Sequence, residues 1–204
     1  PQDYQQAFTL YAELAEQGLV TAQTTLAAMY VQGHGVPQDY VAASGWYKKA
    51  AEQGDVEAQF NLGFMYKKER GVQKNYPLAA YWYKKAAEQG DADAQANIAF
   101  MYHAGQGVAQ DHAQAFYWYK VSAEQGNAKA QYNVGVMRYE GLGIEQDVIE
   151  AHKWFTLSSK KGFSRSVIQK AKIEQKMTAS QIVLSQKMVD EWIVRFTKSV
   201  SFSE

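Results

Sequence analysis

The stretch Trp46-Tyr47-Lys48-Lys49-Ala50-Ala51-Glu52-Gln53-Gly54 recurs, residue for residue, as Trp82 to Gly90. Its final glycine keeps an interval of 36 residues along most of the chain, at Gly18, Gly54, Gly90, Gly126 and Gly162. A fixed period of roughly 20–50 residues indicates stacked structural repeats rather than a closed globule built around one active site.

Each repeat carries the pattern of two helices. Residues 55–90 contain two successive segments in which the apolar residues have the spacing of one face of a helix. These positions are Ala58, Leu62, Met65 and Tyr66 in the first helix, and Ala79, Trp82, Tyr83, Ala86 and Ala87 in the second. We expect Asp55 and Asn75 to cap the two helices, because their side chains can accept hydrogen bonds from free backbone N–H groups. No strand-like alternation competes with this pattern, so the sequence predicts an all-α fold.

Two phrases of the repeat resemble those of a known family. They are the stretch that ends at Gly54 and again at Gly90, and the stretch Ala58-Gln59-Phe60-Asn61-Leu62-Gly63-Phe64-Met65-Tyr66. With the Gly-x-Gly-Val link between the helices, they resemble Sel-one-like repeats, the relatives of tetratricopeptide repeats. The resemblance covers residues 3–162 and implies a right-handed α-solenoid that serves as a scaffold or adaptor. Many bacterial members are exported, so the resemblance favours a periplasmic or secreted location and leaves the cytoplasm open.

The repeat interval divides the chain into segments of one solenoid domain. They are a half repeat at residues 1–18, full repeats at 19–54, 55–90, 91–126 and 127–162, and a C-terminal helical cap at 163–204. Residues 1–18 match a second helix without its first, so we expect either that an upstream part was removed or that this helix is itself a cap.

The cap is predicted from a different pattern. Thr178 and Gln181 have the spacing of a capping box. After them comes one apolar stripe, formed by Ile182, Val189, Trp192, Ile193 and Phe196. We expect this helix to cover the open face of the last repeat, with a shorter helix before it at about 164–176. A helix that lies on a membrane surface is the alternative.

Composition excludes several classes of function. The chain has 204 residues, a formal net charge of +0 and no cysteine. Neutrality argues against general nucleic-acid binding, which needs an excess of Lys and Arg. Without cysteine there is neither a disulfide nor a thiolate metal site. We find no transmembrane run and no signal peptide, and we therefore predict no direct insertion into a membrane.

No catalytic or metal-binding arrangement emerges. The four histidines are His34, His103, His112 and His152, and none forms a His-x-x-x-His pair. We expect His34 and His112 to be loop residues, and the carboxylates to cap helices or face solvent. The sequence therefore predicts no catalytic residue, no metal ligand and no cofactor. A cell-wall hydrolase, an activity proposed within the resembled family, is the enzymatic alternative.

The first helices carry the candidate binding surface. By resemblance to tetratricopeptide arrays, they line a concave face that takes a peptide or a helix of another protein. Asparagine recurs there, and its amide can both donate to and accept from a peptide backbone. The candidate residues are Phe60, Asn61, Phe64, Lys68, Asn97, Phe100, His103, Tyr132, Asn133 and Tyr139. Two alternatives stay open: the asparagines fix the stacking of helices, and the aromatic rings pack between repeats.

A structural role is the second rival to the binding scaffold. The half repeat at residues 1–18 would leave an uncapped end, which could stack on another chain and extend the solenoid. We therefore expect a protein or peptide partner, with self-association through the half repeat as the alternative.

Overall fold

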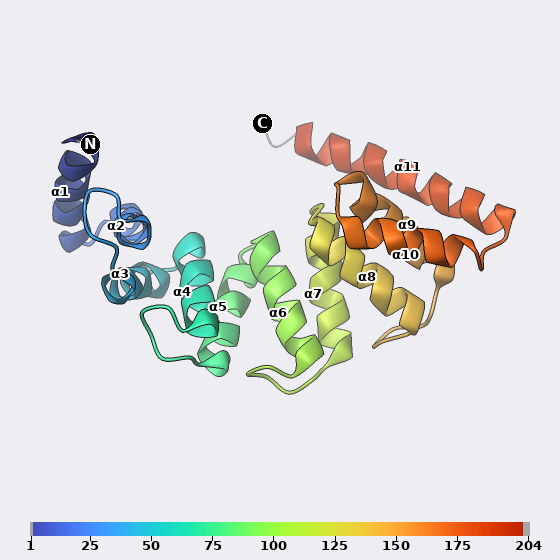
Figure 1. The fold of residues 1–204 in the computed structure, drawn as a ribbon, viewed down its shortest axis with the longest axis horizontal. Coiled ribbons are helices and arrows are strands. Elements are labelled where there is room, and N and C mark those ends of the chain that lie inside the picture. The colour runs from blue at the N-terminus through green and yellow to red at the C-terminus, as the bar shows by residue number, and fades with distance from the viewer. Residues whose placement is uncertain (1, 202–204) are drawn as a thin grey trace. The chain divides into compact units, whose positions relative to one another are not determined.

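The computed structural model describes residues 2–201, which form eleven helices and contain no strand (Figure 1). The helices are α1 (Gln2–Glu16), α2 (Val20–Gln32), α3 (Tyr40–Glu52), α4 (Val56–Lys68), α5 (Tyr76–Glu88), α6 (Ala92–Ala104), α7 (His112–Glu124), α8 (Ala128–Glu140), α9 (Val148–Lys160), α10 (Ser164–Glu174) and α11 (Ala179–Ser201). The predicted all-α fold of stacked helix pairs is confirmed.

The helices group into two compact units. The first is Pro1–Ala94 with Gln106–Val108, and the second is Gln95–Gly105 with Ala109–Glu204. In the first unit α2 packs on α1 and α3, and α4 packs on α3 and α5. In the second unit α8 packs on α7 and α9, while α10 and α11 both pack on α9. The assignment of the whole chain to one domain stays a prediction.

The predicted helix caps are present. The side chains of Asp55 and Asn75 accept hydrogen bonds from the backbone N–H groups of Ala58 and Leu78, at 2.7 and 2.9 Å. Equivalent caps begin α3, α6, α7, α8 and α9, at Asp39, Asp91, Asp111, Asn127 and Asp147. The glycine that ends each repeat has φ between 81° and 101°, in the left-handed region that favours glycine. The capping side chains therefore mark where the helices begin, and the glycines mark where each repeat ends.

The second glycine of each link lies against the backbone of a neighbouring repeat. A β-carbon on Gly71 would overlap the backbone carbonyl of Tyr40, which begins α3 of the preceding repeat. The same overlap recurs for the pairs Gly35 and Tyr4, Gly107 and Tyr76, and Gly143 and His112. Only glycine leaves room for this approach, which explains why the position holds glycine in all four links.

Glutamines connect successive helices in a ladder, in which a buried glutamine on the first helix of a repeat pairs with an exposed glutamine at the end of the second. Gln53 donates from Nε2 to Oε1 of Gln23 at 2.8 Å, and Gln23 donates from Nε2 to the carbonyl of Ala15 at 3.2 Å. The first contact recurs, also at 2.8 Å, between Gln89 and Gln59 and between Gln125 and Gln95. The glutamine in the repeated Ala-Glu-Gln-Gly phrase therefore joins the two helices of its own repeat.

The last repeat breaks this ladder. Lys161 stands where the other repeats have glutamine, and its Nζ donates to the carbonyl of Gly126 instead. Oε1 of Gln131, the counterpart of Gln23, is buried and has no hydrogen-bond partner. The ladder therefore ends on an unsatisfied acceptor, and such a group lowers stability.

The C-terminal helices cover the last repeat as predicted. Thr178 and Gln181 form the capping box. The backbone nitrogen of Thr178 donates to Gln181 Oε1 at 2.8 Å, and that of Gln181 donates to Thr178 Oγ1 at 3.3 Å. On α11, Val189 and Trp192 are buried, and the Trp192 indole donates to Glu124 Oε2 at 2.7 Å. Figure 1 shows this long helix beside α9 and α10. Within residues 2–201, a helix with the length and hydropathy of a membrane span is absent.

Candidate functional site

On α4, the candidate residues occupy two different environments. The Phe60 ring lies 5.6 Å from the Tyr83 ring and contributes to the packing of α4 on α5. Phe64, by contrast, lies under a cation, because the Arg70 guanidinium is 5.5 Å from the centroid of its ring. Asn61 is half-buried and Lys68 is exposed. Asn61, Phe64 and Lys68 share one side of α4, since residues three and four apart on a helix are neighbours.

On α6, Asn97 and Phe100 have the same spacing as Asn61 and Phe64. Phe100 is 37% exposed, an unusual state for a large aromatic side chain within an apolar helix. Asn97, one turn earlier, is half-buried. The neighbouring apolar residues Ile98 and Met101 are fully buried. Helix α6 therefore turns an amide and an aromatic ring outward while its aliphatic residues form the core.

On α8, the aromatic candidates pack against the C-terminal part of the chain. The Tyr132 ring lies 5.7 Å from that of Phe155 and 5.3 Å from that of Phe163. The Tyr139 hydroxyl accepts a hydrogen bond from Lys176 Nζ at 2.8 Å. Asn133 is half-buried, as is Val136 three residues later. On this helix, Asn133 is therefore followed by a smaller apolar side chain, Val136, which packs against the core formed by Ala151, Phe155 and Ile173.

The structure thus gives each of these three helices an asparagine followed, three residues later, by an apolar side chain on the same face. The pairs are Asn61 with Phe64, Asn97 with Phe100, and Asn133 with Val136. The first helix departs from this series, since Thr25 and Ala28 stand at these positions. The ten candidate binding residues stay a prediction.

His103 and His112 form a pair that the sequence analysis missed. The prediction that His112 is a loop residue is wrong: it is the first residue of α7, where it takes the place of Tyr40 and Tyr76. Its ring lies 5.1 Å from that of His103, and Nδ1 of each ring is buried without a hydrogen-bond partner. Burial lowers the pKa of His103, the nearby His112 lowers it further, and Glu140 opposes the shift.

His152 lies at the centre of a buried polar network. Its Nδ1 is 2.8 Å from Ser185 Oγ, and its Nε2 is 3.0 Å from Glu174 Oε1. A serine, a histidine and a carboxylate are also the members of a hydrolytic triad. Here, however, His152 is 1% exposed and Ser185 is completely buried, so a substrate has no route to the hydroxyl. The network joins α9, α10 and α11 and is structural.

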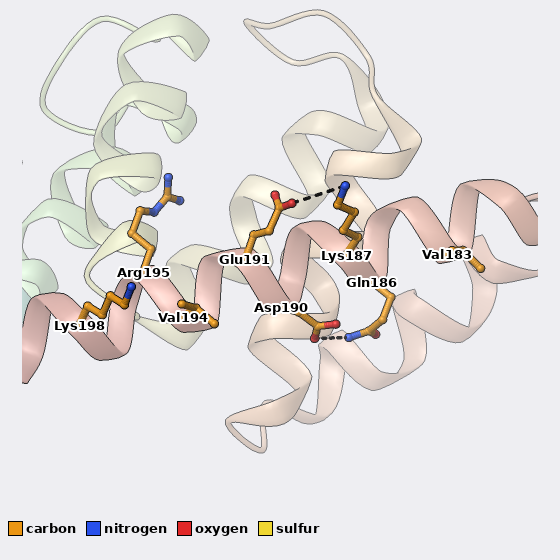
Figure 2. Close-up of a pocket in the computed structure, with 8 residues that line it drawn as sticks. All are labelled: Val183, Gln186, Lys187, Asp190, Glu191, Val194, Arg195 and Lys198. Carbon is orange, nitrogen blue, oxygen red and sulfur yellow. Dashed lines mark hydrogen bonds and ion pairs between the residues drawn. The ribbon is translucent and has the colours of Figure 1, made fainter.

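The exposed side of α11 lines an open hollow, and four of its polar side chains pair with each other. Figure 2 shows the eight residues that line it, all on this helix. Lys187 pairs with Glu191 at 3.9 Å, and Gln186 donates to Asp190 at 2.8 Å. Exposed pairs of this kind are common on helices. In the part of the chain that the structure describes, no group of three or more His, Cys, Asp or Glu could hold a metal ion.

Helix pairs stacked at a constant interval, with glycine-mediated contacts between them, define a helical repeat protein. A model of the Sel1 repeat matches residues 1–19, 20–55, 56–91, 92–127 and 128–163. The chain belongs to the Sel1 repeat family. Proteins of this family are generally non-enzymatic scaffolds for protein–protein interaction.

Solved structures of bacterial proteins share this fold. A protective antigen present in uropathogenic Escherichia coli strains, which displays an SLR fold, is 34% identical with a TM-score of 0.85, over 98% of this chain and 42% of that chain. A Sel1 repeat protein from Oxalobacter formigenes is 34% identical with a TM-score of 0.79, over 83% of this chain and 70% of that chain. An immunity protein from Pseudomonas aeruginosa, 21% identical with a TM-score of 0.50 over 94% and 72% of the two chains, is similar in fold alone.

No curated protein matches the chain. The chain spans less than half the length of the Escherichia coli antigen that it resembles.

Proposed function

We propose that this chain is a binding scaffold whose first helices contact an extended segment of another protein. The observation that carries the proposal is the outward pair of Asn97 and Phe100 on α6, with its counterparts on α4 and α8. An aromatic anchor beside a group that can pair with a peptide backbone is the combination expected of a recognition surface.

The aromatic and asparagine side chains would each contribute to the free energy of binding. Burial of apolar surface contributes about 25 cal/mol per Å², and aromatic residues are enriched among the side chains that dominate interface energies. The asparagine amide offers both a donor and an acceptor, which matches the alternating groups of an extended backbone. A flexible partner loses conformational freedom on binding, so we expect a dissociation constant of about 1 μM.

The test compares two variants that each remove one exposed aromatic ring. The double variant Asn97→Ala/Phe100→Ala removes one outward pair, whereas Tyr117→Ala removes an aromatic ring that is 55% exposed on the second helix α7. Partners captured by the wild-type chain from its own cells are identified by mass spectrometry and their affinities measured. We expect the double variant to bind about tenfold or more weakly and Tyr117→Ala to bind normally. Equal binding by all three chains, or a binding loss that only follows a loss of thermal stability, would refute the proposal.

Self-association is a second candidate, favoured by exposed apolar and aromatic side chains on α1. Leu10 is 55% exposed and Tyr4 is 44% exposed on this helix. A second copy could cover these side chains. Sedimentation equilibrium would then show a mass that rises with concentration, and Leu10→Lys would abolish the rise. A constant monomer mass would eliminate this candidate.

A further inference from the structure

A small pocket lies between α1 and α2, on the same side of the repeat as the candidate surface. Its volume is about 240 Å³, and its walls are Tyr4, Ala7, Tyr11, Thr25, Ala28 and Met29. Gln32 and His34 complete the rim. The Tyr4 and His34 rings stack with their centroids 4.5 Å apart, which gives one side of the pocket a flat aromatic wall.

The neighbouring repeat shows why the pocket exists. Every lining residue has a counterpart 36 positions later, and four of these are identical: Tyr40, Ala43, Tyr47 and Met65. The counterpart of Ala28 is Phe64, and the counterpart of His34 is Arg70. In that repeat the Arg70 guanidinium lies 5.4 Å from the Tyr40 ring and 5.5 Å from the Phe64 ring. A phenylalanine of the chain itself therefore occupies the position that Ala28 leaves open.

We propose that this pocket binds a phenylalanine side chain supplied by a partner protein. The proposal rests on the proposed function and adds to it the kind of residue that the partner presents. The partner's ring would take the place that Phe64 holds in the next repeat, beside the methyl group of Ala28 and against the His34 ring, which stands where Arg70 contacts Phe64.

Size and polarity both fit this occupant. An apolar cavity of about 150 Å³ is large enough to bind benzene, and this pocket is larger. No side chain with a permanent charge lines it, whereas the equivalent positions in the next repeat include Lys68 and Arg70. Thr25 already donates its hydroxyl hydrogen to the Thr21 carbonyl at 2.8 Å. An uncharged aromatic side chain is therefore favoured over a lysine or a carboxylate.

The sharpest test fills the pocket with the residue that the next repeat uses. N-acetyl-L-phenylalaninamide is titrated into the isotopically labelled chain, and NMR shifts are followed at Tyr4, Ala28 and Met29. For wild type we expect saturable shifts with a dissociation constant on the order of 1 mM. Ala28→Phe should lose them while keeping or raising its melting temperature. Ala171→Phe, which adds the same ring at an exposed position on α10, should keep them.

Other outcomes would overturn the inference. It fails if wild type shows no saturable shifts, if Ala28→Phe responds as wild type does, or if N-acetyl-L-lysinamide causes the same shifts. Should Ala28→Phe not fold, Ala28→Val provides the second test, because Val136 occupies this position in the last repeat; a partly filled pocket must bind the probe more weakly. If Ala28→Phe still binds a captured partner while Asn97→Ala/Phe100→Ala does not, the pocket inference fails and the proposed function stands.

Discussion

Gly71 lies so close to the backbone carbonyl of Tyr40 that a β-carbon at this position would overlap the oxygen. This contact places the link of one repeat against the start of the second helix of the repeat before it. The glycine is therefore required for two reasons: its φ is 69°, and the neighbouring backbone leaves no space for a side chain.

Substitution of two glycines separates these two reasons. Gly54 also has a positive φ, of 96°, but a β-carbon there would meet nothing within 4 Å. We expect Gly54→Ala to lower the free energy of unfolding by about 1–2 kcal/mol, the cost of left-handed backbone for a residue with a β-carbon. Gly71→Ala should cost roughly 3 kcal/mol or more, because the backbone must also shift. Urea unfolding measures both, and equal losses would contradict the close contact.

The broken glutamine ladder offers a stabilising substitution. In the second repeat, Gln89 donates both to the Gly54 carbonyl at 3.0 Å and to Gln59 Oε1 at 2.8 Å. Lys161→Gln would give the last repeat the same pair of bonds and supply a donor to the orphan oxygen of Gln131. We expect a gain of about 1 kcal/mol in unfolding free energy.

The control for this gain is Lys160→Gln, which removes the charge of an exposed neighbour and should be neutral. Lys161 also lies 5.2 Å from the Phe196 ring. A loss of stability in Lys161→Gln would show that this contact contributes more than a hydrogen bond to Gln131 Oε1.

The buried network around His152 predicts a dependence of stability on pH. Hydrogen bonds from Lys170 and then from His152 lower the pKa of Glu174 in the folded chain. A carboxyl group with a lowered folded pKa stabilises the protein above its unfolded pKa of about 4.3, and the contribution is lost as the pH falls through the folded value. Glu174→Gln should therefore be less stable than wild type at pH 7, and the difference should shrink below about pH 4.3. A difference that stays constant down to pH 3 would argue against this network.

The histidine pair predicts a titration that can be followed directly. Burial and the nearby His112 lower the pKa of His103, so the imidazole should titrate below its ordinary value of about 6.5. His112→Tyr, which restores the residue found at Tyr40 and Tyr76, should move the midpoint part of the way back, since burial remains. NMR titration of the His103 ring measures the shift. An unchanged midpoint would mean that the two rings do not interact.

Helices and their ends could be predicted from the sequence because each depends on residues close together in the chain. Asp55 caps a helix that starts at the next residue, and Thr178 pairs with Gln181 three positions later. The constant interval then extended these local assignments to every repeat. Tertiary contacts could not be predicted in this way, because their partners are far apart in the sequence. Gln53 bonds to Gln23 across 30 positions, and His152 bonds to Ser185 across 33.

The candidate surface was predictable only as a list of positions. The interval showed that Asn61, Asn97 and Asn133 are equivalent, but it could not show that Tyr139 bonds to Lys176 across 37 positions. Nor could it show that Ala28 leaves a pocket, because the pocket depends on how the Tyr4 and His34 rings stack.

Site-specific photo-crosslinking would show whether a partner protein contacts the first helices or another part of the chain. A photoreactive benzoylphenylalanine is introduced at position 100 on α6, or at position 117 on the second helix α7, and the chain is irradiated in its own cells. We predict covalent adducts with a partner protein from position 100, and none or far fewer from position 117. Adducts from position 117 alone, or equal adducts from both positions, would contradict the assignment of binding to the first helices.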